Sequence, residues 1–371
     1  MSKPKALLLS AYDAQSHQYW RTQLCDWVDT VDWTVLTLPA RNFAWQFRSN
    51  ALQWTLSNKE ALQQRYDLIL ASSMVDLAGL LGLTPGLAGT PSVLYFHENQ
   101  FAYPQGASQH STVELQLSSV ISAMAATQLV FNSEFNRQSF LMGAHSFLKK
   151  MPGAHARPVS ALLGDKTRVL QVPLKAPQNK PTPRTTPSAR PVSIVWNHRW
   201  EFDKGPERLL AFTSALLKTE IEFVLHVMGQ QFRGCPDEFP ALHKLLNTAR
   251  PHALGQWGFV DDQQLYQNML NQADFVLSTA LHDFQGLSVL EAVQRGCRPL
   301  LPRRLAYPEW CPDEFLYDSE PDDVVLEASN AVSRFVALLA NDPPVPSVAS
   351  LEWQTLGPEY KALIQRLCEQ C

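Results

Sequence analysis

Residues 192–218 decide the fold, and they read VSIVW, NHRWEFDKG and PERLLAFTSALLK. The first run is mostly aliphatic and β-branched, which favours a buried strand. The second is polar and ends in glycine. The third repeats apolar residues at helical spacing behind a proline, a residue that the first turn of a helix tolerates. A strand, a polar turn and a helix in this order predict one repeat of a parallel sheet.

The same alternation extends in both directions from this segment. Toward the C-terminus it predicts strands at 223–227, 275–278 and 299–301, and helices at 263–272 and 287–295. Toward the N-terminus it predicts strands at 6–10, 33–38, 68–72, 93–97, 129–132 and 169–172. Helical patterns occupy 112–126 and 134–148, with Ser133 as an N-cap.

A proline-rich stretch separates the two runs of alternation. Residues 173–191 hold prolines at 173, 177, 181, 183, 187 and 191, which is typical of a semi-rigid spacer. We therefore predict an α/β protein with two doubly wound, Rossmann-like domains facing each other across a cleft. The predicted parts are a domain at 1–172, a linker at 173–191, a domain at 192–345 and a helical tail at 346–371.

Composition agrees with two globular domains. The chain has 371 residues, of which 45% are hydrophobic and 18% charged. No apolar run approaches the roughly 20 residues that a membrane helix needs. We expect a cytoplasmic protein without a membrane partner. Among six cysteines only Cys368 and Cys371 have CxxC spacing, and without a second pair they favour stray thiols over a zinc site.

Charge is unevenly distributed although the net charge is only −4. Residues 137–184 hold nine Lys or Arg against the single acid Asp165, whereas residues 305–330 hold eight acids and neither Lys nor Arg. This asymmetry indicates either a basic face for a polyanion or two solvated faces.

Two cations stand in the polar turn at 197–205. Arg199 and Lys204 follow a predicted strand and precede a helix, so they are presented at the carboxyl edge of a sheet. A departing diphosphate gains negative charge, and two fixed cations beside it would lower that barrier. The alternative is a surface loop with an ion pair.

A second turn at 282–291 combines two acids with a glycine. Asp283 ends a strand, and Gly286 lets the backbone approach a ligand before a helix opens at Leu287. Glu291 lies about 6 Å further along that helix at 1.5 Å per residue. The two carboxylates can therefore bracket a diphosphate, while the alternative is an ordinary capped helix.

Together these segments resemble the retaining GT-B glycosyltransferases of the glycogen-synthase-like group. The matching motifs are Lys204-Gly205, Gly258 to Val260, Ala273-Asp274, Asp283 to Glu291 and Ala292 to Gly296. The resemblance implies that Gly258, Phe259 and Val260 lie near the nucleobase and that Glu291 holds the ribose. It also implies that Gly286, Leu287 and Ser288 cradle the diphosphate. Asp283, where the group usually has Glu, would hold the sugar.

Motifs in the N-terminal half, together with two in the C-terminal half, point to one family within this group. Residues 37–48, 94–100, 130–136, 196–201 and 278–280 are similar to the tRNA-queuosine α-mannosyltransferase family. One departure concerns the first loop. There the family usually has Gly-Gly-Ser-His, and this chain has Ala14-Gln15-Ser16-His17. Side chains in place of both glycines can alter donor or acceptor preference.

The resemblance assigns the acceptor to the N-terminal domain. It implies that His97, at a strand end, faces the reacting sugar, although a His there can also be a core group. Arg41, Trp45, Phe47 and Arg48 interleave basic and aromatic residues as nucleic-acid surfaces do, or as an amphipathic loop does. The predicted acceptor-binding residues are Ser16, His17, Arg41, Arg48, Glu98, Asn99, Asn132, Lys149 and Lys150, with Arg157 as a further phosphate contact.

These features predict an enzyme that moves a hexose, mannose from GDP-mannose, to the queuosine base of a tRNA with retention. His97, Arg199, Lys204 and Asp283 would be catalytic, with no metal and no cofactor beyond the nucleotide sugar. Two alternatives stay open. One is a glycosyltransferase of the same fold acting on a lipid or polysaccharide, and the other is a non-catalytic nucleotide-sugar or RNA-binding module.

Overall fold

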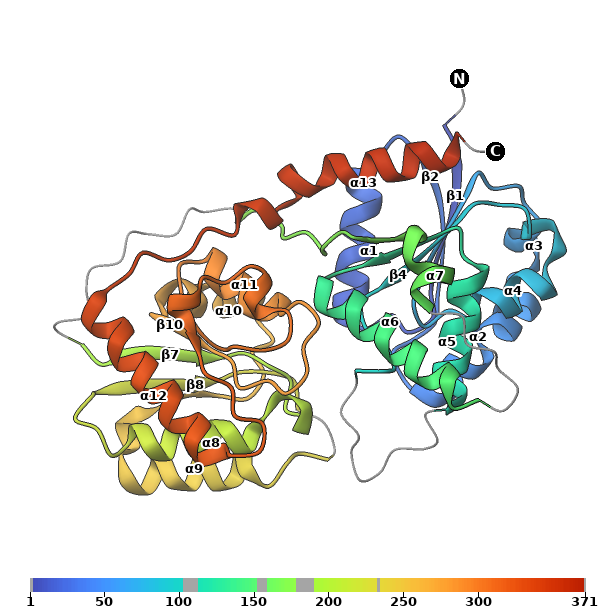
Figure 1. The fold of residues 1–371 in the computed structure, drawn as a ribbon. Helices are drawn as coiled ribbons and strands as arrows, with labels where there is room; N and C mark the ends of the chain where they lie inside the picture. The colour runs from blue at the N-terminus through green and yellow to red at the C-terminus, as the bar shows by residue number, and fades with distance from the viewer. Residues whose placement is uncertain (1–2, 103–112, 152–158, 178–189, 232–233, 370–371) are drawn as a thin grey trace. The chain divides into compact units, whose positions relative to one another are not determined.

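The computed structural model describes residues 3–102, 113–151, 159–177, 190–231 and 234–369. The chain divides into two compact units (Figure 1). Unit 1 is Met1–Pro173 with Leu351–Cys371, and unit 2 is Leu174–Ser350. The C-terminal helix is thus part of unit 1. Of the predicted linker, residues 178–189 lie outside the described residues.

Unit 1 is built on a sheet of six parallel strands in the order β2-β1-β3-β4-β5-β6. The order places β1 beside both β2 and β3, as a doubly wound sheet requires. The strands are β1 (Lys5–Ser10), β2 (Asp32–Thr37), β3 (Leu68–Ser72), β4 (Ser92–Phe96), β5 (Gln128–Phe131) and β6 (Thr167–Val169).

Helices cover both faces of this sheet. One face packs against α2, α4, α5 and α6, and its core includes Leu9, Phe47 and Phe131. The other face carries α1 and α13, whose Trp27 and Trp353 stack; Figure 1 shows these two helices near each other. The helices are α1 (Gln15–Trp27), α2 (Phe43–Ser57), α3 (Lys59–Leu62), α4 (Leu77–Leu83), α5 (Val113–Ala125), α6 (Glu134–Lys149), α7 (Val159–Leu163) and α13 (Trp353–Cys368), with short 3₁₀ turns at Pro85–Leu87 and Gly164–Lys166.

Unit 2 repeats the plan with six parallel strands in the order β12-β11-β10-β7-β8-β9. Residues 192–218 supply the central strand β7 and the helix α8. The strands are β7 (Val192–Trp196), β8 (Phe223–Val227), β9 (Leu254–Trp257), β10 (Phe275–Leu277), β11 (Arg298–Pro302) and β12 (Leu316–Tyr317).

On one side of this sheet lie α8, α9 and α12, and on the other α10 and α11 (Figure 1). The helices are α8 (Pro206–Leu216), α9 (Glu238–Ala249), α10 (Gln263–Gln272), α11 (Leu287–Gln294) and α12 (Val324–Asn341), with 3₁₀ turns at Phe202–Lys204, Pro251–Ala253, Tyr307–Glu309 and Asp313–Phe315, and another, Ala349–Leu351, before α13.

Among the described residues, α12 is the one helix that is long and apolar enough to cross a membrane by length and composition. It packs against α8 and β11. Its inner face buries Phe335 and the carboxylate of Glu327. These contacts make it a covering helix of unit 2.

The predicted α/β fold with two Rossmann-like sheets is confirmed. Strands 68–72, 192–196 and 223–227 and helix 263–272 have the predicted bounds, and Ser133 caps α6 by accepting the Asn136 N–H at 3.0 Å. Two strands, β9 and β12, were not predicted. The helix α2 begins inside the segment 41–48, so this segment is not the amphipathic loop of the alternative interpretation.

Candidate active site

The two predicted cations lie in the turn between β7 and α8. Gly205 ends this turn with φ +67, and a Cβ there would lie 2.1 Å from the Thr279 carbonyl oxygen. Glycine is therefore required where this turn meets the end of β10. The Thr279 hydroxyl donates to the Lys204 carbonyl at 2.9 Å. These contacts hold Lys204 beside the turn that follows β10.

Lys204 is almost buried and is surrounded by acceptors. Its ammonium donates to the His282 carbonyl at 2.7 Å and lies 3.3 Å from the Asp203 carboxylate and 3.8 Å from that of Asp283. Arg199, by contrast, is half-exposed and pairs with Glu201 at 3.0 Å. The turn therefore presents one fixed, buried cation and one solvated cation.

Asp283 is held as a carboxylate. Burial would raise its pKa, but the Lys204 ammonium, the His198 and His282 rings and the Gly286 N–H outweigh burial and lower it. The Gly286 N–H donates to one carboxylate oxygen at 2.9 Å. The ionised side chain can thus accept hydrogen bonds from sugar hydroxyls.

Two buried histidines flank Lys204, and both are neutral at pH 7. Burial first, and then the Lys204 charge, lowers the pKa of His198 to about 4 and that of His282 to about 4. The His198 Nε2 is buried with no hydrogen-bond partner among the described residues. A ligand could satisfy this atom, since buried polar groups are seldom left unpaired.

The helix α11 begins at Leu287 directly after Gly286, whose φ is +79. Asn197 secures its first turn by donating to the Ser288 carbonyl at 2.8 Å and to the Tyr266 hydroxyl at 3.0 Å. The main-chain N–H groups that open α11 and the helix dipole suit the predicted binding of an anion.

Glu291 lies one turn further along α11. Burial raises the pKa of its carboxyl, while Arg295 and a hydrogen bond from Tyr266 oppose this effect. The Arg295 Nε lies 3.9 Å away, and the Glu291 side chain remains partly exposed. An acceptor that is both oriented and accessible fits the predicted contact with two ribose hydroxyls.

The predicted nucleobase segment follows β9. Gly258 has φ +96, its N–H donates to the Val227 carbonyl at 2.9 Å, and a Cβ there would lie 3.0 Å from the Gln231 amide. Phe259 is half-exposed. The segment therefore offers an aromatic ring at the carboxyl edge of the sheet, which suits stacking on a planar base.

In unit 1 the predicted His97 follows β4 within an aromatic cluster. Its ring stacks on His17 at 4.2 Å, meets Trp20 edge-on at 4.8 Å and lies 4.7 Å from the Tyr95 ring. Burial and the neighbouring His17 lower the pKa of His97 well below its usual range. Its Nε2 is buried without a partner among the described residues. His97 is a neutral imidazole with one unused nitrogen.

Asn99 and Asn132, which were predicted to bind the acceptor, make hydrogen bonds within unit 1. Asn132 donates to the His97 carbonyl at 2.9 Å and accepts from the Asn136 amide at 2.8 Å. Asn99 donates to Asn136 and accepts from the main chain of Phe101. Their amides are therefore engaged in holding the turn that carries His97 and the part-exposed Glu98.

The predicted basic contacts lie on the surface of unit 1. Arg41, Lys149 and Lys150 are exposed, as is Ser16 at the start of α1. Arg48 is also exposed, but it pairs with Glu114 at 2.7 Å. Arg157 lies outside the described residues.

One part of the nucleic-acid interpretation is corrected by the structure. Phe47 is 3% exposed and belongs to the core of unit 1, so it cannot stack on a base. The reason is helical geometry, because α2 turns Phe47 inward and leaves Trp45 66% exposed.

Several residues of the site were not predicted. Asn197, Asp203, Tyr266 and Tyr307 all contact predicted residues. Asn197 and Asp203 could have been found, because they flank Arg199 and Lys204 in one turn. Within the described ranges, no group of three or more His, Cys, Asp or Glu could hold a metal ion.

Comparison with known proteins relates the N-terminal part of the chain to a family. The sequence profile described as "tRNA-queuosine alpha-mannosyltransferase N-terminal" matches residues 5–174. Residues 5–174 are therefore similar to the N-terminal part of that family. A Drosophila melanogaster protein named tRNA-queuosine alpha-mannosyltransferase is 29% identical over 325 residues, covering 86% of this chain and 84% of the relative. The resemblance inferred from the sequence is thereby confirmed.

Solved structures agree on the fold. Sucrose-phosphate synthase from Thermosynechococcus elongatus matches with a TM-score of 0.72 at 14% identity, with full coverage of both chains. HepE from Anabaena, solved with UDP and glucose, matches with a TM-score of 0.64 at 15% identity over 98% of this chain and 100% of that one. The chain has the GT-B fold, and the predicted enzyme class, glycosyltransferase, is confirmed.

Proposed function

We propose that this protein transfers mannose from GDP-mannose to the queuosine base of a tRNA. The observation that carries the proposal is the buried Lys204 between the carboxylates of Asp203 and Asp283, beside the start of α11. The queuosine acceptor is supported by the family of residues 5–174 and by the name of the Drosophila relative.

In the proposed reaction, the bond between the anomeric carbon and the diphosphate breaks while a bond to an acceptor hydroxyl forms on the same face. The hydroxyl proton passes to the departing diphosphate. Lys204 and Arg199 stabilise the charge that develops there, and the buried Lys204, already held in place, needs no reorganisation during the reaction. Asp283 orients the sugar through its hydroxyls.

Three groups of residues in unit 2 suit the base, the ribose and the diphosphate of a nucleotide sugar. The main chain at Gly258 and the ring of Phe259 serve the base, Glu291 the ribose, and the start of α11 the diphosphate. The buried, unpartnered Nε2 of His198 is one further group that this ligand can satisfy. We propose that the nucleotide sugar is the one small-molecule co-substrate, used in the cytoplasm.

A lipid or polysaccharide acceptor is the competing proposal within the same fold. Mass spectrometry of tRNA from a deletion strain separates the two. Loss of a hexose from queuosine, restored by the intact gene and not by a Lys204→Ala copy, is the expected result. A tRNA pool unchanged by deletion would contradict the queuosine acceptor.

A further inference from the structure

The loop that follows β11 contains a tyrosine that touches the proposed sugar-binding acid. Tyr307 is completely buried, at 0% exposure, and its hydroxyl lies 3.3 Å from the Asp283 carboxylate and 2.7 Å from the Ser278 hydroxyl. The carboxylate therefore has one oxygen on the Gly286 N–H and the other shared by Tyr307 and Lys204.

The direction of these hydrogen bonds follows from the charge of Asp283. An ionised carboxylate only accepts, so the single Tyr307 proton points to Asp283. The Ser278 hydroxyl must then donate to the tyrosine oxygen, and it accepts in turn from the Ala280 N–H at 3.2 Å. Ala280, Ser278 and Tyr307 form a one-way chain that ends on the carboxylate.

The ring of Tyr307 also supports the turn that opens α11. A Cβ at position 286 would lie 2.8 Å from the tyrosine ring. The ring thus packs against Gly286, the residue whose N–H holds the other oxygen of Asp283. The Tyr307 side chain therefore positions both the Asp283 carboxylate and the turn at Gly286.

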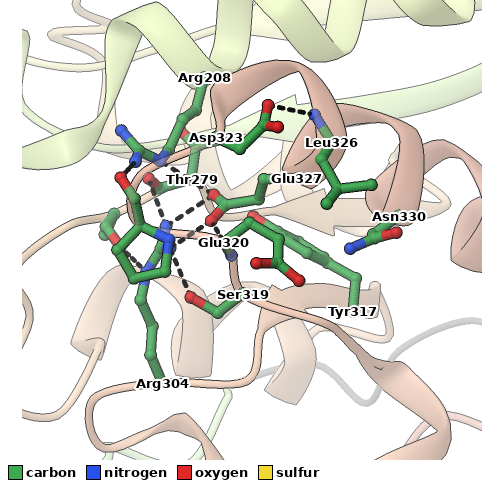
Figure 2. A network of polar contacts seen from close by, with 12 residues as sticks. Arg208, Thr279, Arg304, Tyr317, Ser319, Glu320, Asp323, Leu326, Glu327 and Asn330 are labelled. Carbon is green, nitrogen blue, oxygen red and sulfur yellow. Dashed lines mark hydrogen bonds and ion pairs between the residues drawn. The ribbon is translucent and has the colours of Figure 1, made fainter.

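The loop itself is clamped to the interior of unit 2, as Figure 2 shows. Arg304 pairs with the buried Glu327 at 2.7 Å and donates to the carbonyls of Ala280 at 2.8 Å and Thr279 at 3.2 Å. Arg208 contacts the same carboxylate at 3.0 Å. The contacts of Arg304 with Glu327, Ala280 and Thr279, called the anchor below, thus join the loop after β11 to the segment between Ser278 and Asp283.

The backbone of the loop indicates that it needs this anchor. Leu305, between Arg304 and Tyr307, has φ +60, a left-handed conformation that is unfavourable for a residue with a side chain. Such a conformation persists where the surroundings determine it. The ion pair of Arg304 on one side and the buried Tyr307 on the other supply that constraint.

We propose that Tyr307 is a positioning residue for Asp283, held in place by the Arg304–Glu327 pair, and that it sets the affinity for the sugar part of the donor. The proposal rests on the proposed function, in which Asp283 binds the sugar. An aspartate reaches one methylene less than the usual glutamate. A buried hydroxyl that fixes its orientation makes the shorter side chain effective.

The test compares two ligands, GDP-mannose and GDP, by calorimetry. Tyr307→Phe keeps the ring and removes the hydroxyl, and it should weaken GDP-mannose binding about 10-fold, the scale of a lost hydrogen bond to a charged group. GDP binding should be unchanged, because GDP lacks the sugar. Tyr317→Phe is the matched control. It removes the hydroxyl of another buried tyrosine, which donates to the Ser278 carbonyl at 2.8 Å.

Non-additivity provides a second readout. In an Asp283→Asn background, Tyr307→Phe should have little further effect on GDP-mannose binding, since both changes remove one interaction. Equal losses for GDP and GDP-mannose, or equal losses in Tyr307→Phe and Tyr317→Phe, would overturn the proposal. If Tyr307→Phe does not fold, Ser278→Ala interrupts the same chain and should give a smaller loss, again selective for GDP-mannose.

A third readout needs no donor and separates this proposal from the proposed function. The pKa of Asp283, followed by NMR of its carboxyl carbon, should rise in Tyr307→Phe, because a hydrogen bond to the ionised form is lost. Lys204, His198, His282 and the Gly286 N–H face the same carboxylate and remain in place. An unchanged pKa would overturn the positioning role. A parent protein that binds neither ligand would instead contradict the proposed function.

Discussion

In the proposed reaction, Lys204 and Arg199 stabilise the same departing charge from different environments. Lys204 is nearly buried between carboxylates, whereas Arg199 is half-exposed. Replacing either by alanine should lower kcat by about 10²–10³-fold, the range seen for single groups that stabilise developing charge. Single-turnover rates at saturating tRNA measure this effect. An unchanged kcat with weaker tRNA binding would remove the residue from the donor site.

The histidines beside Lys204 make unit 2 sensitive to acid. Their pKa values are about 4 in the folded protein against an ordinary 6.5. As pH falls from 6.5 toward 4 the unfolded chain binds protons that the folded unit does not, so stability falls. The slope for each histidine is at most about 1.4 kcal/mol per pH unit.

Hydrogen exchange of β7 and β10 at pH 6.5 and 4.5 measures this loss within unit 2. The variant His282→Gln should show roughly half of the parent's decrease in protection, because His198 still titrates. Equal decreases in the variant and the parent would show that His282 does not contribute.

At the scale of residues, the sequence predicted the groups that lie at strand ends and helix starts. Arg199 and Asp283 follow β7 and β10 by a few residues, and such positions meet at one edge of a parallel sheet. Tyr307 could not be found in this way. It approaches Asp283 only because Arg304 anchors a loop to Glu327, a contact between residues 23 apart in the sequence that follows no periodicity.

Among the elements, α13 contributes to a site far from it in sequence. Its Tyr360 hydroxyl accepts from Trp20 at 3.2 Å and lies 3.0 Å from the Tyr95 hydroxyl and 2.9 Å from the Gln171 carbonyl. Trp20 and Tyr95 are the rings that pack around His97. The last helix of the chain therefore supports the proposed acceptor side.

Tyr360→Phe should destabilise unit 1 by about 1–3 kcal/mol, since it leaves the buried Trp20 N–H without an acceptor. Denaturant unfolding, with hydrogen exchange to assign the change to β1 and β4, measures it. Tyr66→Phe is a control within the same unit, because that hydroxyl donates to a single main-chain carbonyl at 2.8 Å. A loss no larger than that of the control would contradict the supporting role.

The elements that escaped prediction share a physical cause. β9 is only partly buried and irregular in register, and β12 has two residues, so neither has a recognisable hydrophobic pattern. The start of α2 has Asn42 in a left-handed conformation without a side-chain cap, which hides the helix boundary. The long buried strands, by contrast, were found with errors of one or two residues.

For the whole molecule, the acceptor's charge should match the basic surface of unit 1. Lys149 and Lys150 are exposed at the end of α6, and phosphate contacts there would release counterions. The double change to alanine should flatten the slope of log affinity against log salt by about one unit. Filter binding of tRNA at several salt concentrations measures it, with Lys218→Ala/Lys244→Ala in unit 2 as a control. An unchanged slope would show that Lys149 and Lys150 are solvated and do not contact tRNA phosphates.

The most direct test of the account is transfer itself, measured with purified protein, labelled nucleotide sugars and defined tRNA. We predict that label from GDP-mannose appears on queuosine-containing tRNA, that tRNA lacking queuosine stays unlabelled, and that the α-anomer is formed. Lys204→Ala should reduce the rate by about 10²–10³-fold. Absence of label on queuosine with every nucleotide sugar tried, or label on a lipid or glycan in its place, would contradict the proposed function.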